Sequence, residues 1–68
     1  MIVSVNGQCR ELHGSATVAS VLELLDVAPG ARGVAVALDG EVVTRSCWHE
    51  TPLADGAQIE VVAAIGGG

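Results

Sequence analysis

The sequence contains no lysine and only three arginines, Arg10, Arg32 and Arg45, against eight acidic residues, which gives a net charge of −5. Binding to nucleic acid or to an anionic membrane requires clustered basic side chains that neutralise phosphates. Three scattered arginines do not form such a cluster. We therefore expect no nucleic acid and no membrane among the partners, and an acidic chain is better suited to a basic or mixed protein surface.

Long apolar runs are also missing from the sequence. Gly, Asp or Glu interrupts each apolar segment well before the ~18 residues that a membrane-spanning helix needs, and no basic segment followed by an apolar one stands at the start. Two cysteines, Cys9 and Cys47, are too few for a disulfide framework and do not form a CxxC pair. These features predict a cytoplasmic protein with two reduced thiols.

Side chains suited to zinc are few: Cys9, His13, Cys47 and His49. Cys9 and His13 would lie about 13 Å apart on one strand at ~3.3 Å per residue, whereas zinc holds its ligands at ~2.0 to 2.3 Å. The same separation argues against a Cys-His nucleophile, and no third group that would orient His49 beside Cys47 is evident. We expect no metal site and no catalytic residues.

What remains is an apolar chain of 68 residues, 50% hydrophobic and 16% charged, which is enough for one small folded domain. The only aromatic residue is Trp48, so the core must consist mainly of Val, Leu, Ile and Ala. Asn6-Gly7 and Asp39-Gly40 are typical of two-residue hairpin turns, because both residue types tolerate positive φ. The first turn joins strands expected over residues 1–5 and 8–13, and the second lies within "GVAVALDGEVVT".

Between the two hairpins, apolar residues recur at helical spacing: Val18, Val21, Leu22 and Leu25. Thr17 or Ser15 can cap this helix, and Pro29-Gly30 prevents it from continuing. Residues 45–56 are polar and punctuated by turn residues, which predicts a loop with room for one helical turn. The apolar run over residues 58–65 suits a strand that is covered on both faces or lies in the middle of a sheet.

The order β-β-α-β-β-β predicts an α+β fold, the ubiquitin-like β-grasp, in which one helix crosses one face of a mixed sheet. On that fold the helix-facing residues are Val3, Val5, Ile59 and Val61. Ile2, Val62 and Ala64 lie on the open face, where they either form a docking surface or are ordinary scattered apolar residues.

Three glycines, Gly66, Gly67 and Gly68, follow the last expected strand. Glycine is costly to order and buries no side chain, so this run adds little to stability. We divide the chain into a domain over residues 1–65 and a flexible tail over residues 66–68. A frayed terminus without a role is the alternative, and a phosphate-binding loop is disfavoured because neither a lysine nor a helix follows the glycines.

Three segments, "TVASVLELL", "GVAVALDGEVVTRSCWHETPLADG" and "IEVVAAIGGG", resemble the sulfur carrier protein of thiamine biosynthesis, the ThiS family of ubiquitin-like β-grasp proteins. The resemblance runs in register over nearly the whole chain. Its more specific part is Arg45-x-x-Trp48, followed by Thr51-Pro52-Leu53 and Asp55-Gly56 at a fixed distance from the tail.

The resemblance implies that the chain is a protein substrate and carrier rather than an enzyme. A partner enzyme of the ThiF type, similar to ubiquitin-activating enzymes, would use ATP to adenylate the carboxylate of Gly68. A sulfur donor such as a cysteine desulfurase would convert the adenylate to a thiocarboxylate, and thiazole synthase of the ThiG type would receive the sulfur. Gly66 and Gly67 would be the flexible lead, and the chain itself would bind no cofactor.

Two questions stay open at this point. Arg45 and Trp48 either contact the activating enzyme, or Trp48 closes one end of the core while Arg45 neutralises a carboxylate. Other functions compatible with the sequence are a small subunit of molybdopterin synthase, a ubiquitin-like protein modifier and a non-covalent β-grasp interaction module.

Overall fold

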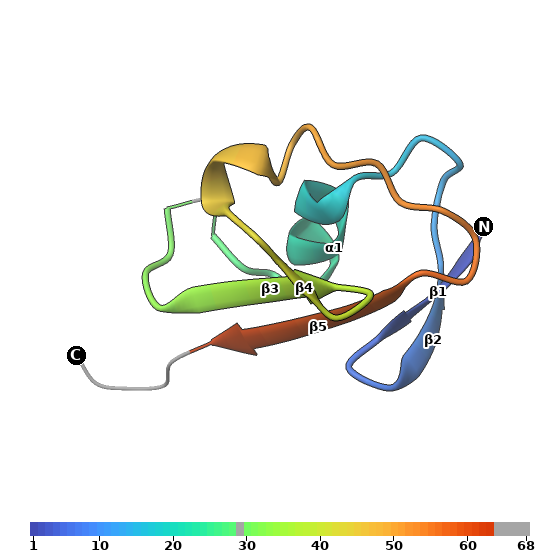
Figure 1. The fold of residues 1–68 in the computed structure, drawn as a ribbon, viewed down its shortest axis with the longest axis horizontal. Coiled ribbons are helices and arrows are strands. Elements are labelled where there is room, and N and C mark those ends of the chain that lie inside the picture. The colour runs from blue at the N-terminus through green and yellow to red at the C-terminus, as the bar shows by residue number, and fades with distance from the viewer. Residues whose placement is uncertain (29, 64–68) are drawn as a thin grey trace.

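The computed structural model describes residues 1–28 and 30–63, which form a five-stranded sheet, one α-helix and one 3-10 turn (Figure 1). The elements follow in the order β1 (Ile2–Val5), β2 (Gln8–Glu11), α1 (Val18–Leu24), β3 (Val34–Leu38), β4 (Glu41–Val43), η1 (Arg45–Cys47) and β5 (Gln58–Ala63). This is the order expected from the sequence, and η1 is the helical turn expected after the second hairpin.

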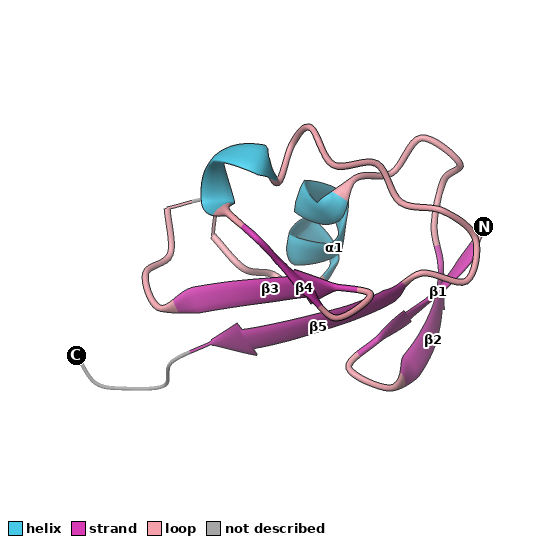
Figure 2. Ribbon diagram, viewed as in Figure 1, coloured by secondary structure: helices cyan, strands magenta, loops and turns pink. Residues whose placement is uncertain are grey.

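The last strand, β5, lies at the centre of the sheet, whose strand order is β2-β1-β5-β3-β4. It runs parallel to β1 and antiparallel to β3, and the two hairpins β1–β2 and β3–β4 complete the sheet. Figure 2 shows α1 and η1 on one side of the sheet, with no described element on the other. The predicted β-grasp architecture is confirmed. Of the two alternatives predicted for β5, the position in the middle of the sheet is the one observed, and its open face is not covered, because Val62 is 65% exposed.

Both hairpin turns have the backbone that their sequences predict. Asn6 and Gly7 have φ values of 51° and 84°, and Asp39 and Gly40 have 49° and 88°. Positive φ at both central residues matches the right-handed twist of the flanking strands. These turns therefore set the register of each hairpin locally.

The start of α1 is held by the segment that precedes β5. Thr17 is the N-cap residue, one of the two predicted. The amides of Val18 and Ala19, which have no acceptor within the helix, donate to the carbonyls of Thr51 and Trp48 at 3.0 Å each. The helix is thus tied to the segment between η1 and β5.

The end of α1 differs from the expectation. The helix ends before the Pro-Gly pair at residues 29–30, because Asp26 adopts a left-handed φ of 59°. The amide of Val27 reaches back to the carbonyl of Leu22 at 2.9 Å, and that of Asp26 to Glu23 at 3.1 Å, which is the Schellman pattern of a helix end. The aspartate, rather than the proline, stops the helix.

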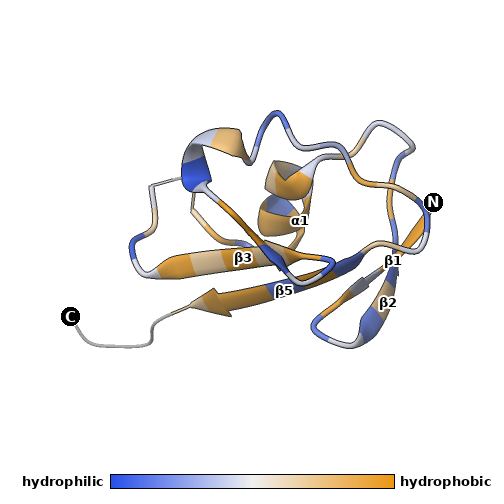
Figure 3. Ribbon diagram, viewed as in Figure 1, coloured by the Kyte–Doolittle hydropathy of each residue, from blue (hydrophilic) through white to orange (hydrophobic). Residues whose placement is uncertain are grey.

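The core lies between α1 and the sheet, and Figure 3 shows the apolar colouring of the elements that enclose it. Its buried apolar residues are Val3, Val5, Ala16, Val18, Val21, Leu22, Val36, Trp48, Leu53, Ala57 and Ile59. The predicted inward positions on β1 and β5 are confirmed, with Val61 half-buried against the core. Ile2 and Val62 are exposed on the opposite face, as predicted, and Ala64 lies outside the described residues.

Candidate functional site

The predicted reactive group, Gly68, lies outside the described residues, as do Gly66 and Gly67. The structure describes the strand that leads to them. β5 runs through the centre of the sheet, and its last residue, Ala63, lies opposite Val34, the first residue of β3 (Figure 1). The base of the tail is therefore the end of the sheet where β3 begins.

Two neighbours hold β5, but over different lengths. β3 pairs with it from Ile59 to Ala63, whereas β1 pairs with it only at Gln58 and Ile59. The side chain of Asn6 extends the support on the β1 side to the backbone of Val61. Sequence reasoning identified Asn6 only as a turn residue and missed this contact.

An apolar patch covers the open face beside the base of the tail. We call it the open-face patch and define it as Ala35, Ala37, Val42 and Val62. Ala35 lies opposite Val62, and Ala37 lies opposite Val42, so the four residues adjoin across β5, β3 and β4. Val42 is 76% exposed and Val62 is 65% exposed.

Ile2 faces the same side but does not belong to this patch. It is 47% exposed, and its carbonyl accepts a hydrogen bond from the amide of Gly56, six residues before Val62. Val5 lies opposite Ile59, so Ile2 lies three strand residues from that level in one direction and Val62 three in the other, which is about 20 Å in total. The structure thus separates Ile2 from Val62, although both were predicted for one docking surface.

Trp48 and Arg45 are in contact with each other. They lie at the end of the sheet where β3 begins, which is also the base of the tail. Trp48 is 5% exposed, and its indole N–H donates to the carbonyl of Val43 at 2.9 Å. The guanidinium carbon of Arg45 lies 4.6 Å from the centroid of the indole ring, and the same side chain donates to the carbonyl of Ala31. Trp48 is thus a core residue, and Arg45 ties η1 to the loop that enters β3.

The cysteines and histidines are not gathered into one site. Cys9 and Cys47 are exposed free thiols, and Cys47 accepts a hydrogen bond from the Thr44 hydroxyl at 3.4 Å. Within residues 1–28 and 30–63, no three His, Cys, Asp or Glu side chains are grouped so that they could hold a metal ion.

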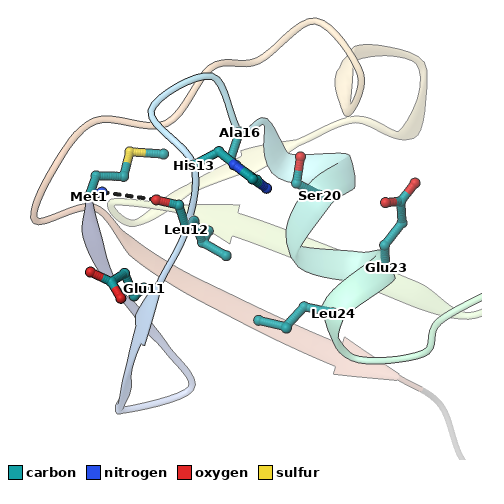
Figure 4. Close-up of a pocket in the computed structure, with 8 residues that line it drawn as sticks. All are labelled: Met1, Glu11, Leu12, His13, Ala16, Ser20, Glu23 and Leu24. Carbon is teal, nitrogen blue, oxygen red and sulfur yellow. Dashed lines mark hydrogen bonds between the residues drawn. The ribbon is translucent and has the colours of Figure 1, made fainter.

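Two clefts open on the helix side of the sheet. The larger, of about 600 Å³, lies between the end of β2 and α1 (Figure 4). Leu12 and Leu24 point toward its interior, while Glu23 points away from it. The smaller, of about 210 Å³, lies between α1 and η1 and is lined in part by Arg45 and Trp48.

The helices of the described part are too short or too polar to cross a membrane.

Comparison with known proteins gives consistent results. A family model described as the ThiS family matches residues 3–68. A curated relative named thiazole synthase, from Paramagnetospirillum magneticum, is 38% identical over 68 residues; the match covers 100% of this chain and 20% of that protein. This chain therefore spans about a fifth of the length of that relative.

Two solved structures of a thiamine biosynthesis protein (ThiS) from Geobacter metallireducens are also similar. The crystal structure is 36% identical with a TM-score of 0.78, and the match covers 100% of both chains. The solution structure is 37% identical with a TM-score of 0.78, covering 100% of this chain and 88% of the other. The sequence resemblance is thereby confirmed, and this chain belongs to the ThiS family.

Proposed function

We propose that this protein is a sulfur carrier for thiazole formation in thiamine biosynthesis, and that Gly68 carries the sulfur. The observation that supports the proposal most strongly is the family match, which extends from residue 3 through all three terminal glycines. The similar solved structures are thiamine biosynthesis proteins, and their likeness covers this whole chain.

The chemistry needs only the carboxylate of Gly68 from this chain. One carboxylate oxygen attacks the α-phosphorus of ATP, which forms an acyl–phosphate bond and releases pyrophosphate. With sulfide as the donor, its sulfur attacks the acyl carbon, the bond to AMP breaks, and AMP leaves with the electron pair. Loss of the sulfur-bound proton gives the thiocarboxylate, and with sulfide no oxidant or reductant is consumed. With the persulfide of a cysteine desulfurase the same attack gives an acyl disulfide, which a thiol reductant must cleave to release the thiocarboxylate.

A small rigid body with a glycine tail suits this chemistry. The acyl adenylate must be shielded from water inside a partner enzyme, and glycines fit a narrow channel because they lack Cβ. Five residues follow Ala63, and they span at most ~18 Å when extended. The folded domain must therefore dock close to the active site that modifies Gly68.

We propose three partners: an adenylating enzyme of the ThiF type that consumes ATP, a sulfur donor such as a cysteine desulfurase, and thiazole synthase. The relative named thiazole synthase contains a segment that is homologous to this whole chain, and this supports the last of the three partners. The open-face patch is the surface we assign to docking, because it adjoins the base of the tail and contains Val42 and Val62, both largely exposed.

The experiment is an intact-mass measurement after incubation with a ThiF-type enzyme, ATP and sulfide. The protein should gain the mass difference between sulfur and oxygen, and fragmentation should locate the gain at Gly68. A matched protein amidated at Gly68 has no carboxylate and should gain nothing. Sulfur found elsewhere, or an unchanged mass with an active enzyme, would refute the proposal.

A further inference from the structure

The first residue of each hairpin turn holds β5 through its side chain. Asn6 Oδ1 accepts a hydrogen bond from the amide of Val61 at 2.8 Å, and Asn6 Nδ2 donates to the carbonyl of Val61 at 3.3 Å. Asp39 Oδ1 accepts from the amide of Gln58 at 2.9 Å. The two turns thus hold the central strand at different places. Asp39 holds its first residue, Gln58, and Asn6 holds Val61, which is closer to the tail.

The carboxamide of Asn6 takes the place of a strand residue. β1 ends at Val5, and the backbone amide of Asn6 still donates to the carbonyl of Ile59 at 2.9 Å. The chain then turns away, so the next position of β5 that faces β1, Val61, has no backbone of β1 beside it. A carboxamide offers one acceptor and one donor, as a peptide group does, and it satisfies both groups of Val61.

Beyond Val61 the support becomes one-sided. Val62 and Ala63 pair with Ala35 and Val34 of β3, and the described residues contain no strand paired with them on the other side. Asn6 therefore marks the last point at which β5 is held from both sides before the glycine tail.

We propose that Asn6 is a positioning residue for the tail. By holding Val61, it fixes the direction in which the chain leaves the sheet and limits the length that moves before Gly68. This inference rests on the proposed function, because the direction of the tail matters only if Gly68 reacts. Small displacements of a reacting group lower the rate of the chemical step, so the effect should fall on kcat.

The choice of asparagine makes the idea testable. The first turn position, with a φ of 51°, is open to glycine as well as to asparagine. Asn6→Gly therefore preserves the turn and removes only the side-chain contacts with Val61. Asp39→Gly is the matched control, because it removes the corresponding contact with Gln58 from a turn of the same type.

The experiment compares wild type, Asn6→Gly, Asn6→Asp and Asp39→Gly in two measurements. Amide hydrogen exchange followed by NMR reports on Val61 and Gln58. Intact mass reports kcat and KM for thiocarboxylate formation with a ThiF-type enzyme, ATP and sulfide. Circular dichroism confirms that each variant is folded.

In Asn6→Gly we expect exchange of the Val61 amide to become roughly threefold to tenfold faster, with Gln58 unchanged, because that amide loses its hydrogen bond to Asn6 Oδ1. We expect kcat to fall about threefold or more, and KM to stay constant because the open-face patch is intact. Asn6→Asp keeps the acceptor for Val61 and should recover part of both effects. Asp39→Gly should speed exchange at Gln58 and leave kcat unchanged.

An Asn6→Gly protein with the kcat of wild type would overturn the inference. An equal fall of kcat in Asn6→Gly and Asp39→Gly would also overturn it, because general loosening of the sheet would then be the cause. A wild-type protein that gains no sulfur would refute the proposed function instead. In that case the exchange rate of Val61 alone would decide whether Asn6 holds β5.

Discussion

The two faces of the sheet carry similar side chains but differ in what covers them. On the hairpin β3–β4, Val36 faces α1 and is 1% exposed, whereas Val42 faces the open side and is 76% exposed. Burial against the helix explains the first valine, whereas for the second the fold offers only the strand preference of a β-branched residue. The comparison teaches that the covered face provides stability, while the open face is available for a partner.

The largest expected effect lies on the covered face, at Trp48. Trp48→Ala should lower the free energy of unfolding by about 3 to 5 kcal/mol, since it leaves a large cavity and frees the carbonyl of Val43. A chain of this length is stabilised by only roughly 3 to 10 kcal/mol in total. Urea denaturation followed by circular dichroism measures the change.

Trp48→Phe sharpens this prediction, because it keeps an aromatic ring but removes part of the indole together with its N–H. It should cost less than Trp48→Ala, about 1 to 3 kcal/mol. A Trp48→Ala protein as stable as wild type would show that Trp48 is not a core residue. Contact with the activating enzyme would then be the better explanation of this tryptophan.

The second prediction compares the faces directly, with one substitution at two positions of the same hairpin. Val36→Ala should lower the free energy of unfolding by about 2 kcal/mol, and Val42→Ala should change it by less than about 0.5 kcal/mol. Equal losses would contradict the division between the two faces. The same denaturation experiment serves for both variants.

The sequence predicted the parts of this fold that depend on local chemistry. Asn6-Gly7 and Asp39-Gly40 form turns through their own backbone preferences, so each hairpin follows from a few neighbouring residues. The stripe of α1 is likewise local, because the spacing of apolar residues along one segment decides which face is buried.

Contacts between segments that are distant in the chain could not be predicted from the sequence. Asn6 and Val61 are 55 positions apart, and no local signal links them. The separation of Ile2 from Val62 depends on the register of β1 against β5, which alternation alone does not fix. The role of Asp26 in ending α1 was missed, because an aspartate in a left-handed conformation is a weaker signal in the sequence than a Pro-Gly pair.

The candidate site divides in the same way. The glycine tail was evident from the sequence, since three consecutive glycines have no value for folding, and the resemblance to a family gave Gly68 its expected role. The open-face patch became visible only when the structure placed Val42 of β4 beside Ala37 and near Val62 of β5.

The third and smallest prediction tests the open face itself. Val62→Ser should weaken association with a ThiF-type enzyme roughly tenfold, because an apolar side chain no longer contributes at the interface. Ile2→Ser changes an exposed residue on the same face but far from the patch, and it should leave the affinity unchanged. Isothermal titration calorimetry measures both affinities, and equal losses would contradict the boundary of the open-face patch.

The central claim is that sulfur passes through the carboxyl group of Gly68. The most direct measurement starts with protein thiocarboxylated with radioactive sulfur and follows the label after addition of thiazole synthase and its other substrates. We predict that the label moves from the protein into the thiazole product. Label that stays on the protein while thiazole forms, or equal thiazole formation from protein amidated at Gly68, would contradict the account.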